Sequence, residues 1–166
     1  MLISDEHFLR LAIALAHQAR RDGADPFGAV LVATGVVVHQ ARDRSVEMSD
    51  PTFHAELSVV SEYCRARRLF SLEGYTLYCS TEPCPMCAGA IHWARLSRVV
   101  FSVSQAMLQE LSGGSPKLLC ASIIGSPRRP VEIVGPLLLE EGLAVFAGFP
   151  FIPKAERHQR TTKKYN

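Results

Sequence analysis

The sequence has little net charge, and this excludes two classes of protein. Its 166 residues include 18 lysines and arginines against 16 aspartates and glutamates, which gives a formal net charge of +2. So small a charge creates no large electrostatic field of the kind that holds nucleic acid non-specifically. The chain is therefore neither a strongly basic nucleic-acid coat protein nor an acidic disordered protein, although a local basic patch is compatible with this balance.

The sequence also lacks a long apolar run and a secretion signal. A membrane-spanning helix needs about 18 or more consecutive apolar residues, and no run in the sequence reaches this length. The first charges of the N-terminal stretch are Asp5 and Glu6, and Arg10 interrupts its apolar part, unlike a signal peptide. We therefore expect a cytoplasmic protein with no membrane partner.

Disulfide bonds are not expected either. The five cysteines are an odd number, and without a secretion signal they indicate reduced thiols, of which paired cysteines more often bind metal or do redox work. Cys64, Cys79 and Cys120 are expected to be small buried apolar residues.

The length corresponds to about one domain, since domains usually have roughly 100–200 residues. The periodicity of apolar residues predicts helices and strands in the order helix 5–22, strand 28–33, strand 36–40, helix 52–67, strand 75–80, helix 85–95, strand 98–103, strand 131–134 and helix 137–147. Residues 104–129 give no clear assignment. Strands that alternate with helices predict an α/β layered sandwich with a mixed sheet. We expect a single domain over residues 1–153, followed by a polar, basic tail, 154–166, that is only partly ordered.

Three residues are spaced like the ligands of a metal site. Cys84 and Cys87 lie at positions i and i+3 at the start of a predicted helix, so both thiols point the same way and the helix dipole favours their thiolate forms. His54 lies near the start of the preceding helix. If these two helix N-termini lie side by side, one nitrogen and two sulfur ligands converge. Three protein ligands leave the fourth tetrahedral position open, as a catalytic zinc site requires.

Glu56 follows His54 by two residues and is the candidate catalytic residue. A carboxylate at this offset can face the open position of the metal instead of binding the metal. Water bound to zinc has a pKa lowered to about 7 in favourable sites. Glu56 can accept its proton and act as a general acid and base.

The same residues carry a family resemblance. His54-Ala55-Glu56, followed by Pro83-Cys84-Pro85-Met86-Cys87, is the H-x-E and P-C-x-x-C signature of the zinc deaminases. Around these motifs, residues 26–30 (PFGAV), 50–56 (DPTFHAE) and 82–87 (EPCPMC), with Trp93-Ala94-Arg95, resemble the cytidine-deaminase-like superfamily. The resemblance covers about residues 5–150. It is strongest to the branch that holds guanine deaminases and tRNA adenosine deaminases.

The resemblance implies a fold and a reaction. The fold is a three-layer α/β/α sandwich around a five-stranded mixed sheet, and members of this branch usually form homodimers. One zinc ion per chain, held by His54, Cys84 and Cys87, carries a hydroxide that attacks the ring carbon bearing an exocyclic amine. Glu56 transfers the proton to the ring nitrogen and then to the departing ammonia. The backbone amides of Ala55 and Cys84 bind a small heterocyclic substrate.

The sequence departs from the family pattern in the loop that precedes DPTFHAE. Asp43 stands where close relatives usually have a base-binding asparagine. Because an ionised carboxylate only accepts hydrogen bonds, Asp43 in the pocket would prefer a ring N–H or an amino group over a carbonyl. The alternative is a solvated loop aspartate. Phe53 replaces an alanine that is common in this branch, and it narrows the pocket, stacks on a base or packs at the start of the helix.

Three aromatic residues are further candidates for substrate binding. Phe27 either stacks on the substrate or packs in the core. Trp93 borders the pocket or a dimer face, or packs in the core. Tyr165 follows Lys163 and Lys164 in a tail that resembles the tail with which guanine deaminases close the pocket.

Three functions are compatible with these residues. The first is a deaminase of a nucleobase, nucleoside or related amino-heterocycle, as in purine metabolism. The second is a tRNA adenosine deaminase, which the near-neutral charge disfavours because tRNA binding needs phosphate contacts. The third is a non-catalytic structural zinc module, which predicts a fourth protein ligand and has no use for Glu56.

Overall fold

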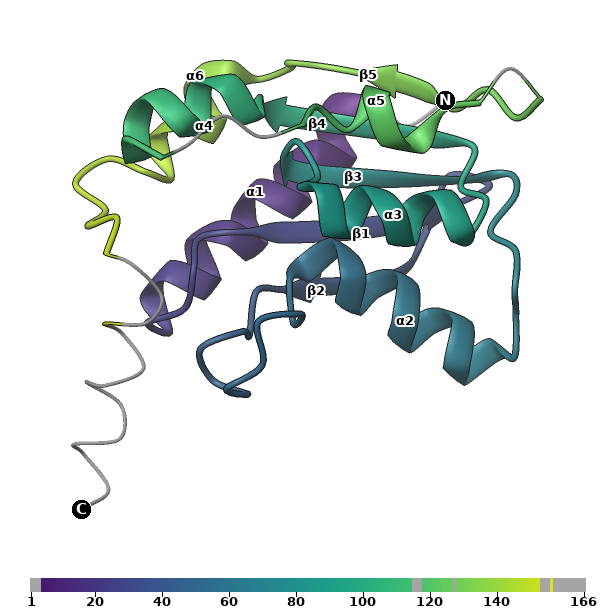
Figure 1. The fold of residues 1–166 in the computed structure, drawn as a ribbon, viewed down its shortest axis with the longest axis horizontal. Helices are drawn as coiled ribbons and strands as arrows, with labels where there is room; N and C mark the ends of the chain where they lie inside the picture. The colour runs from purple at the N-terminus through teal and green to yellow at the C-terminus, as the bar shows by residue number, and fades with distance from the viewer. Residues whose placement is uncertain (1–3, 115–117, 127, 153–155, 157–166) are drawn as a thin grey trace.

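Five strands form the central sheet of the computed structural model, which describes residues 4–114, 118–126, 128–152 and 156 (Figure 1). Helices and strands follow in the order α1 (Asp5–Arg21), β1 (Gly28–Ala33), β2 (Val36–Arg42), α2 (Ala55–Arg67), β3 (Tyr75–Thr81), α3 (Pro85–Trp93), β4 (Arg98–Val103), α4 (Gln105–Ser112), α5 (Ala121–Ile124), β5 (Glu132–Val134) and α6 (Leu139–Ala144). The strand order across the sheet is β2-β1-β3-β4-β5. Strand β1 pairs antiparallel with β2 and β3, whereas β3, β4 and β5 are parallel to one another. The predicted five-stranded mixed sheet in an α/β fold is confirmed.

Helices cover both faces of this sheet (Figure 1). In β1, Ala29 and Leu31 pack into one apolar cluster with α2, α3 and α5. Val30 and Val32 point to the opposite face and pack with α1 and residues of α4 and α6. The burial of both faces explains why β1 reads as a continuous apolar run, since each side chain of a strand points to the face opposite its neighbour's.

The strand directions bring two helix N-termini to one edge of the sheet. Because β1 is antiparallel to both of its neighbours, β2 and β3 run in the same direction and end at the same edge. The loop after β2 leads into α2, and β3 leads directly into α3, the crossover to parallel β4. Ligand sites in open α/β sheets lie outside the carboxyl ends of the strands. The topology therefore predicts the site where α2 and α3 begin.

The helices differ from the sequence prediction by three residues or more at three places. The second helix begins at Ala55, not Thr52, because His54 has extended backbone angles (φ −70°, ψ 153°). The last helix is shortened to Leu139–Ala144, since Leu138 adopts a left-handed conformation at φ 51°. The unassigned stretch 104–129 contains α4 and α5, and the Ser104 hydroxyl caps α4 by accepting a hydrogen bond from the backbone of Met107 at 3.2 Å. No helix within the described ranges has the length and apolar character needed to cross a membrane.

Asp5 connects the first helix to the middle of the sheet. Its carboxylate accepts hydrogen bonds from both terminal nitrogens of Arg98, at 2.6 and 2.8 Å, and from the hydroxyl of Tyr78 at 2.8 Å. Arg98 also pairs with Glu132 of β5 at 2.9 Å. The hydrogen bond from Arg98, assisted by the one from Tyr78, lowers the pKa of the Asp5 carboxyl despite its partial burial. The cluster thus holds α1 against β3, β4 and β5.

We predict that Asp5→Asn lowers the free energy of unfolding at neutral pH by about 1 kcal/mol, because it removes a charge-assisted, partly exposed hydrogen-bonding group. A carboxyl whose pKa is lower in the folded protein than in the unfolded chain stabilises the fold above its unfolded pKa and loses this contribution as the pH falls through its folded pKa. Denaturant unfolding should therefore show a wild-type advantage at neutral pH that shrinks in acid.

Glu6→Gln is the matched control for this measurement. Glu6 lies on the same helical turn, but its ion pair among the described residues is an exposed i,i+4 pair with Arg10 at 3.5 Å. Its replacement should change stability little. If the difference in the free energy of unfolding between wild type and Asp5→Asn grew as the pH fell, this result would contradict the role assigned to Asp5.

Candidate active site

Two residues that precede helices face each other at the carboxyl edge of the sheet. His54 is the N-cap of α2 and Cys84 is the N-cap of α3, and both have extended backbone angles. Pro85 occupies the first turn of α3, where its fixed φ suits a helix and its missing N–H costs nothing. The turn that follows places Cys87 on the same side of the helix as Cys84.

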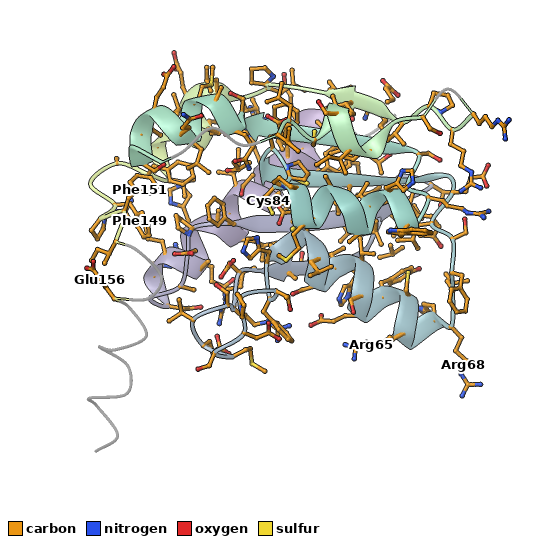
Figure 2. All side chains as sticks on the ribbon, in the orientation of Figure 1. Arg65, Arg68, Cys84, Phe149, Phe151 and Glu156 are labelled. Atoms are coloured by element: carbon orange, nitrogen blue, oxygen red, sulfur yellow. The ribbon has the colours of Figure 1, made fainter. Side chains whose placement is uncertain are left out.

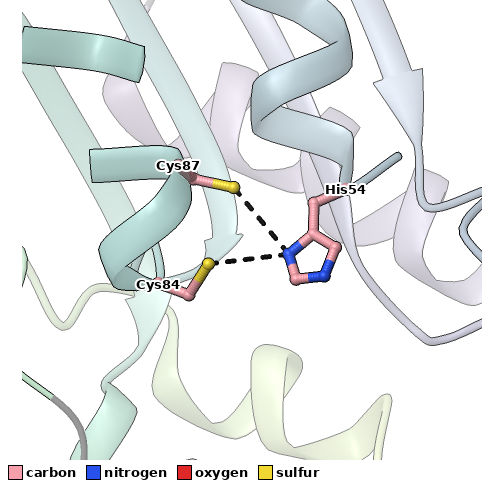
Figure 3. Close-up of side chains that lie close together, drawn as sticks. All are labelled: His54, Cys84 and Cys87. Carbon is pink, nitrogen blue, oxygen red and sulfur yellow. Dashed lines mark hydrogen bonds between the residues drawn. The ribbon is translucent and has the colours of Figure 1, made fainter. Parts of the chain in front are cut away.

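The side chains of His54, Cys84 and Cys87 converge (Figure 3). The Nδ1 atom of His54 lies 3.6 Å from the Sγ atom of Cys84 and 3.8 Å from that of Cys87. The three potential ligand atoms all lie within 4.8 Å of one another. One imidazole nitrogen and two sulfur atoms are a donor set that zinc prefers. The residues present therefore fit a zinc ion.

The thiols already differ in acidity. The hydrogen bond between the two cysteines lowers the pKa of Cys84 to about 3, with a further lowering by His54, and the same bond together with burial raises the pKa of Cys87. A thiolate is the form of cysteine that binds metal. Binding of a cation requires both cysteines to be deprotonated, so metal binding releases protons.

Glu56 lies beside this cluster in the first turn of α2. Its side chain is buried, at 5% exposure, and the thiol of Cys87 donates a hydrogen bond to Oε2 at 3.5 Å. Burial raises the pKa of the Glu56 carboxyl to about 7. A carboxyl with a pKa near the working pH is well suited to accept and return a proton. The structure thus places a proton-transfer group next to the three donor atoms.

A cavity of about 180 Å³ opens at this cluster. Sites for drug-sized ligands usually measure about 300–1,000 Å³, so this cavity suits one small ring system. Its wall includes His54, Glu56 and Cys84, together with side chains from the turn before β1, the end of β3, helix α4 and the segment after α6. These further wall residues are Asp25, Phe27, Thr81, Glu82, Gln105, Leu108, Ser112, Phe149 and Phe151.

The segment after α6 contributes two aromatic side chains to the wall, Phe149 and Phe151, which Figure 2 labels. Arg20 at the end of α1 donates hydrogen bonds to the carbonyl oxygens of Val145, at 2.6 Å, and Ala147, at 2.8 Å. Its guanidinium also lies over the ring of Phe149, 5.9 Å from the ring centre. The ring of Phe151 packs edge-on against Phe149, with ring centres 5.3 Å apart. Arg20 therefore positions this part of the wall.

Glu82 ties three elements together just before Cys84. One carboxylate oxygen accepts a hydrogen bond from the backbone of Gln105 at 2.9 Å, and the other accepts one from the backbone of Cys120 at 3.0 Å. The side chain of Gln105 donates back to the carbonyl oxygen of Glu82 at 2.6 Å. Both carboxylate oxygens of Glu82 are thus occupied by backbone hydrogen bonds, and these bonds position the turn that carries Cys84.

The residues predicted to bind substrate differ in their position relative to the cavity. Phe27 and Cys84 lie in the cavity wall, and Ala55 is buried at the first position of α2. Trp93 lies at the far end of α3, 81% exposed, and borders a different hollow. Tyr165 lies outside the described residues.

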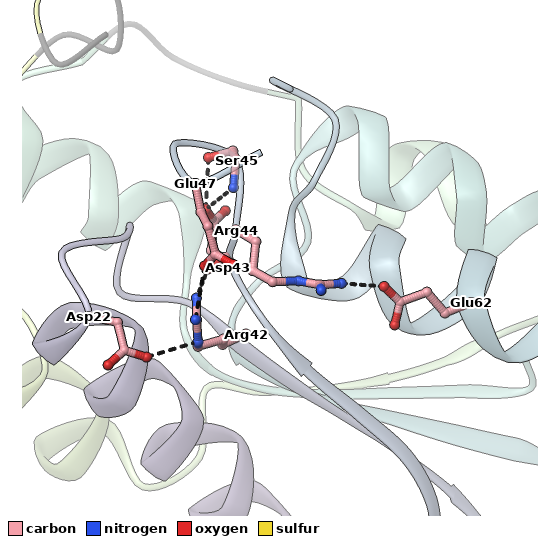
Figure 4. A network of polar contacts seen from close by, with 7 residues as sticks. All are labelled: Asp22, Arg42, Asp43, Arg44, Ser45, Glu47 and Glu62. Carbon is pink, nitrogen blue, oxygen red and sulfur yellow. Dashed lines mark hydrogen bonds and ion pairs between the residues drawn. The ribbon is translucent and has the colours of Figure 1, made fainter. Parts of the chain in front are cut away.

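Asp43 is buried in the loop after β2 and does not belong to the described cavity wall. Its Oδ1 atom accepts hydrogen bonds from the backbone of Ser45 at 2.9 Å and from the Ser45 hydroxyl at 2.7 Å (Figure 4). Its Oδ2 atom is buried with no hydrogen-bond partner within the described residues. The alternative of a solvated loop aspartate is wrong because the side chain is fully buried. Its contact with substrate stays a prediction.

Phe53 lies in the same loop, and its ring is covered by the guanidinium of Arg44, 5.1 Å from the ring centre. Arg44 in turn forms an ion pair with Glu62 of α2. These contacts favour the interpretation that Phe53 packs at the start of the helix.

Sequence reasoning missed several wall residues, namely Asp25, Thr81, Glu82, Gln105, Leu108, Ser112, Phe149 and Phe151. Asp25 directly precedes the motif at 26–30 and Glu82 begins the motif at 82–87, so an acidic residue at each of these positions was an available signal. The residues of α4 and of the C-terminal segment have no local signal, because only packing brings them to the cavity.

Comparison with known proteins identifies the chemistry. A family model described as the cytidine and deoxycytidylate deaminase zinc-binding region matches residues 2–103. A probable cytosine deaminase of Schizosaccharomyces pombe is 39% identical over 150 residues, which are 87% of this chain and 91% of that protein. A tRNA-specific adenosine deaminase of Bacillus subtilis is 41% identical over 100 residues, 60% of this chain and 62% of that protein.

A solved structure shows the same similarity. The X-ray structure of a guanine deaminase from Bacillus subtilis has a TM-score of 0.64 at 29% identity, and the match covers 91% of this chain and 98% of that chain. The similar proteins are named for three different substrates. The comparisons therefore identify a reaction and a cofactor, zinc, but no single substrate.

We predict that purified protein contains about one zinc ion per chain and that Cys87→Ser loses most of it, because a serine hydroxyl replaces a thiolate ligand. Elemental analysis of protein dialysed against a zinc-free buffer measures this content. Cys64→Ser is the matched control, since Cys64 is a half-buried cysteine of α2 outside the cluster. Equal zinc content in both variants would contradict the assigned ligands.

Proposed function

This chain belongs to the cytidine and deoxycytidylate deaminase family as a zinc-dependent hydrolytic deaminase, and we propose that its substrate is a free, amino-substituted heterocyclic base. The observation that supports this substrate class is the cavity of about 180 Å³ beside His54, Cys84 and Cys87, which has room for one small ring system. No lysine or arginine lies in the part of the wall that the structure describes. A phosphorylated substrate would thus find no cationic partner there.

In the proposed mechanism, His54, Cys84 and Cys87 hold the metal, which supplies a Lewis acid when bound. Glu56 takes one proton from the attacking water and delivers it to the ring nitrogen beside the carbon that carries the amine. The water oxygen forms a bond to that carbon, and the carbon–nitrogen bond to the amine breaks. Glu56 then takes the remaining proton from the new hydroxyl group and delivers it to the amine, which leaves as ammonia, so that the ring keeps a carbonyl group and a protonated ring nitrogen.

The backbone at the two helix starts, at Ala55 and Cys84, supports substrate orientation in this proposal. N–H groups in the first turn of a helix have no partner within the helix. They can therefore donate to acceptor atoms of a bound ring. Phe27 would pack against the plane of that ring, because it lies in the same cavity wall.

A tRNA adenosine deaminase is the second candidate, because a relative of that name is 41% identical over 100 residues of this chain. Two observations disfavour it, because tRNA binding needs cationic groups that contact phosphates. The formal net charge is only +2, and the described part of the cavity wall contains no lysine or arginine. A structural zinc module is less well supported, since the cluster found among the described residues has three members, not four.

We predict that the zinc-loaded protein releases ammonia from at least one free base and that Glu56→Gln lowers kcat by about 100-fold or more, because it removes the general acid and base. Ammonia release is measured on guanine, cytosine, adenine, pterins, triazines and their nucleosides, and inosine formation is measured on tRNA. Activity on tRNA without activity on any free base would select the second candidate.

Glu110→Gln is the control for this experiment, because Glu110 is an exposed carboxylate on α4 outside the cavity wall. It should retain wild-type kcat. Zinc content should stay near the wild-type value in both variants. Full activity of Glu56→Gln would contradict the mechanism.

We further propose that the protein forms a homodimer through an apolar face between α2 and α3, as expected from the family resemblance. Phe70 is 97% exposed and Trp93 is 81% exposed. Both border an apolar hollow of about 580 Å³, whose wall also includes Val60 and Leu69. Exposed apolar patches of this kind mark interaction sites, and the proposed occupant is a second copy of the chain.

We predict that Trp93→Lys shifts the protein toward the monomer, because a charge placed in an apolar interface is costly to desolvate. Light scattering after gel filtration measures the molecular mass. Val36→Lys is the control. Val36 is also an exposed apolar residue, at 60%, but it lies on β2 and is not among the residues that line this hollow. A wild-type monomer at micromolar concentration would contradict the proposal.

A further inference from the structure

The direction of the His54 side chain depends on the segment that precedes α2. His54 is the N-cap of this helix and has extended backbone angles, so regular helix geometry does not set its position. The peptide group that joins Phe53 to His54 is instead held from both sides. Its carbonyl oxygen accepts a hydrogen bond from the backbone N–H of Arg44 at 3.0 Å, and its N–H donates to the carbonyl oxygen of Thr52 at 2.8 Å. The loop after β2 therefore positions the histidine of the metal cluster.

Arg44 holds Phe53 through its side chain as well. Its guanidinium carbon lies over the ring of Phe53, 5.1 Å from the ring centre. A cation in this position is attracted electrostatically by the face of the aromatic ring. Arg44 thus contacts Phe53 by its backbone and by its side chain, and Phe53 is the residue directly before the metal ligand His54.

Glu62 of α2 fixes the other end of the Arg44 side chain. One of its carboxylate oxygens accepts a hydrogen bond from the Nη2 atom of Arg44, as Figure 4 shows, and the other lies 3.0 Å from the Nε2 atom of His39 on β2. The side chains of Arg44 and Glu62 are only 29% and 27% exposed, so solvent ions screen this pair less than a fully exposed one. Glu62 thus connects strand β2, helix α2 and the loop between them.

The proposed mechanism assigns no step to Arg44 or Glu62. Neither residue is among the described residues of the cavity wall or among the three donor residues. Their contacts lead instead from the sheet and α2 to the residue before His54. Groups outside the ligand set that orient a metal ligand are a general part of metal sites, and their loss typically lowers metal affinity or activity by roughly 10–100-fold.

We propose that Arg44 and Glu62 are positioning residues that hold His54 in the direction in which it meets Cys84 and Cys87. Glu62 fixes the guanidinium of Arg44, and Arg44 fixes Phe53 together with the peptide group that leads to His54. When this connection is broken, the imidazole samples other directions and the site binds zinc less tightly. This inference rests on the zinc site of the proposed function, but it concerns metal affinity and not the substrate.

The Kd for zinc, measured by competition with a chromogenic chelator, tests this assignment without any turnover. Arg44→Gln should raise this Kd by about tenfold, because it removes both the ion pair and the contact with the Phe53 ring. Glu62→Leu should have a similar effect, whereas Glu62→Gln keeps an oxygen acceptor for Arg44 and should recover most of the loss. The double variant of Arg44→Gln with Glu62→Leu should bind zinc no more weakly than either single variant, because both changes break the same connection.

Arg67→Gln is the matched control. Arg67 also lies over an aromatic ring, that of Tyr63, 5.8 Å from the ring centre, but it is the last residue of α2 and the helix begins beside His54. Its replacement should leave the Kd for zinc unchanged. Denaturant unfolding of the zinc-free variants should give midpoints close to that of wild type, because a partly exposed ion pair contributes little to stability. An unchanged Kd in Arg44→Gln, an equal rise in Arg67→Gln, or a rise confined to variants that are unfolded without zinc would each overturn the assignment.

Ammonia release by the zinc-loaded wild-type protein separates this inference from the proposed function. Ammonia release together with a Kd for zinc that does not depend on Arg44 or Glu62 overturns the inference alone. A Kd that depends on both residues, without ammonia release from any base, overturns the proposed function alone. A wild-type protein that binds no zinc and releases no ammonia overturns both.

Discussion

The antiparallel position of β1 between β2 and β3 is the constraint on which the site depends. Because β2 and β3 then run in the same direction, the loop after β2 and the end of β3 meet at one edge of the sheet. The helices that follow, α2 and α3, begin there with their N-caps, His54 and Cys84, in contact. If β1 paired parallel with either neighbour, the two N-termini would lie at opposite edges and the donor atoms could not converge.

This arrangement also combines two environments that proton transfer needs. The hydrogen bond with Cys87 lowers the pKa of the Cys84 thiol to about 3, whereas burial favours the protonated form of Glu56 and raises its pKa to about 7. Cys87 lies between the two groups, and its thiol donates a hydrogen bond to Glu56 at 3.5 Å. A metal-binding cluster and a carboxyl that exchanges a proton near neutral pH can therefore exist side by side.

The substrate wall has a different origin from the metal cluster. Arg20 holds the segment after α6 by two hydrogen bonds to backbone carbonyls, so that Phe149 and Phe151 reach the cavity. Gly28 allows α1 to lie directly on β1, and the turn between them presents Asp25 and Phe27. These wall segments come from parts of the chain other than those that carry the donor atoms. A change in the wall therefore need not disturb the metal cluster, and the similar chains are named for cytosine, guanine and tRNA adenosine deamination.

The part of this site that is local in the chain was predictable from the residue spacing alone. His54 and Glu56 are two residues apart, and Cys84 and Cys87 are three apart, so helix geometry alone orients each pair. The α/β class and most elements were predictable for the same reason, since their periodicity is local. Tertiary structure decided what lies at a distance along the chain: Phe149 entered the cavity wall, Trp93 was left exposed and Asp43 was buried. Their positions depend on how helices pack on the sheet, and long-range packing has no periodic signal in the neighbouring residues.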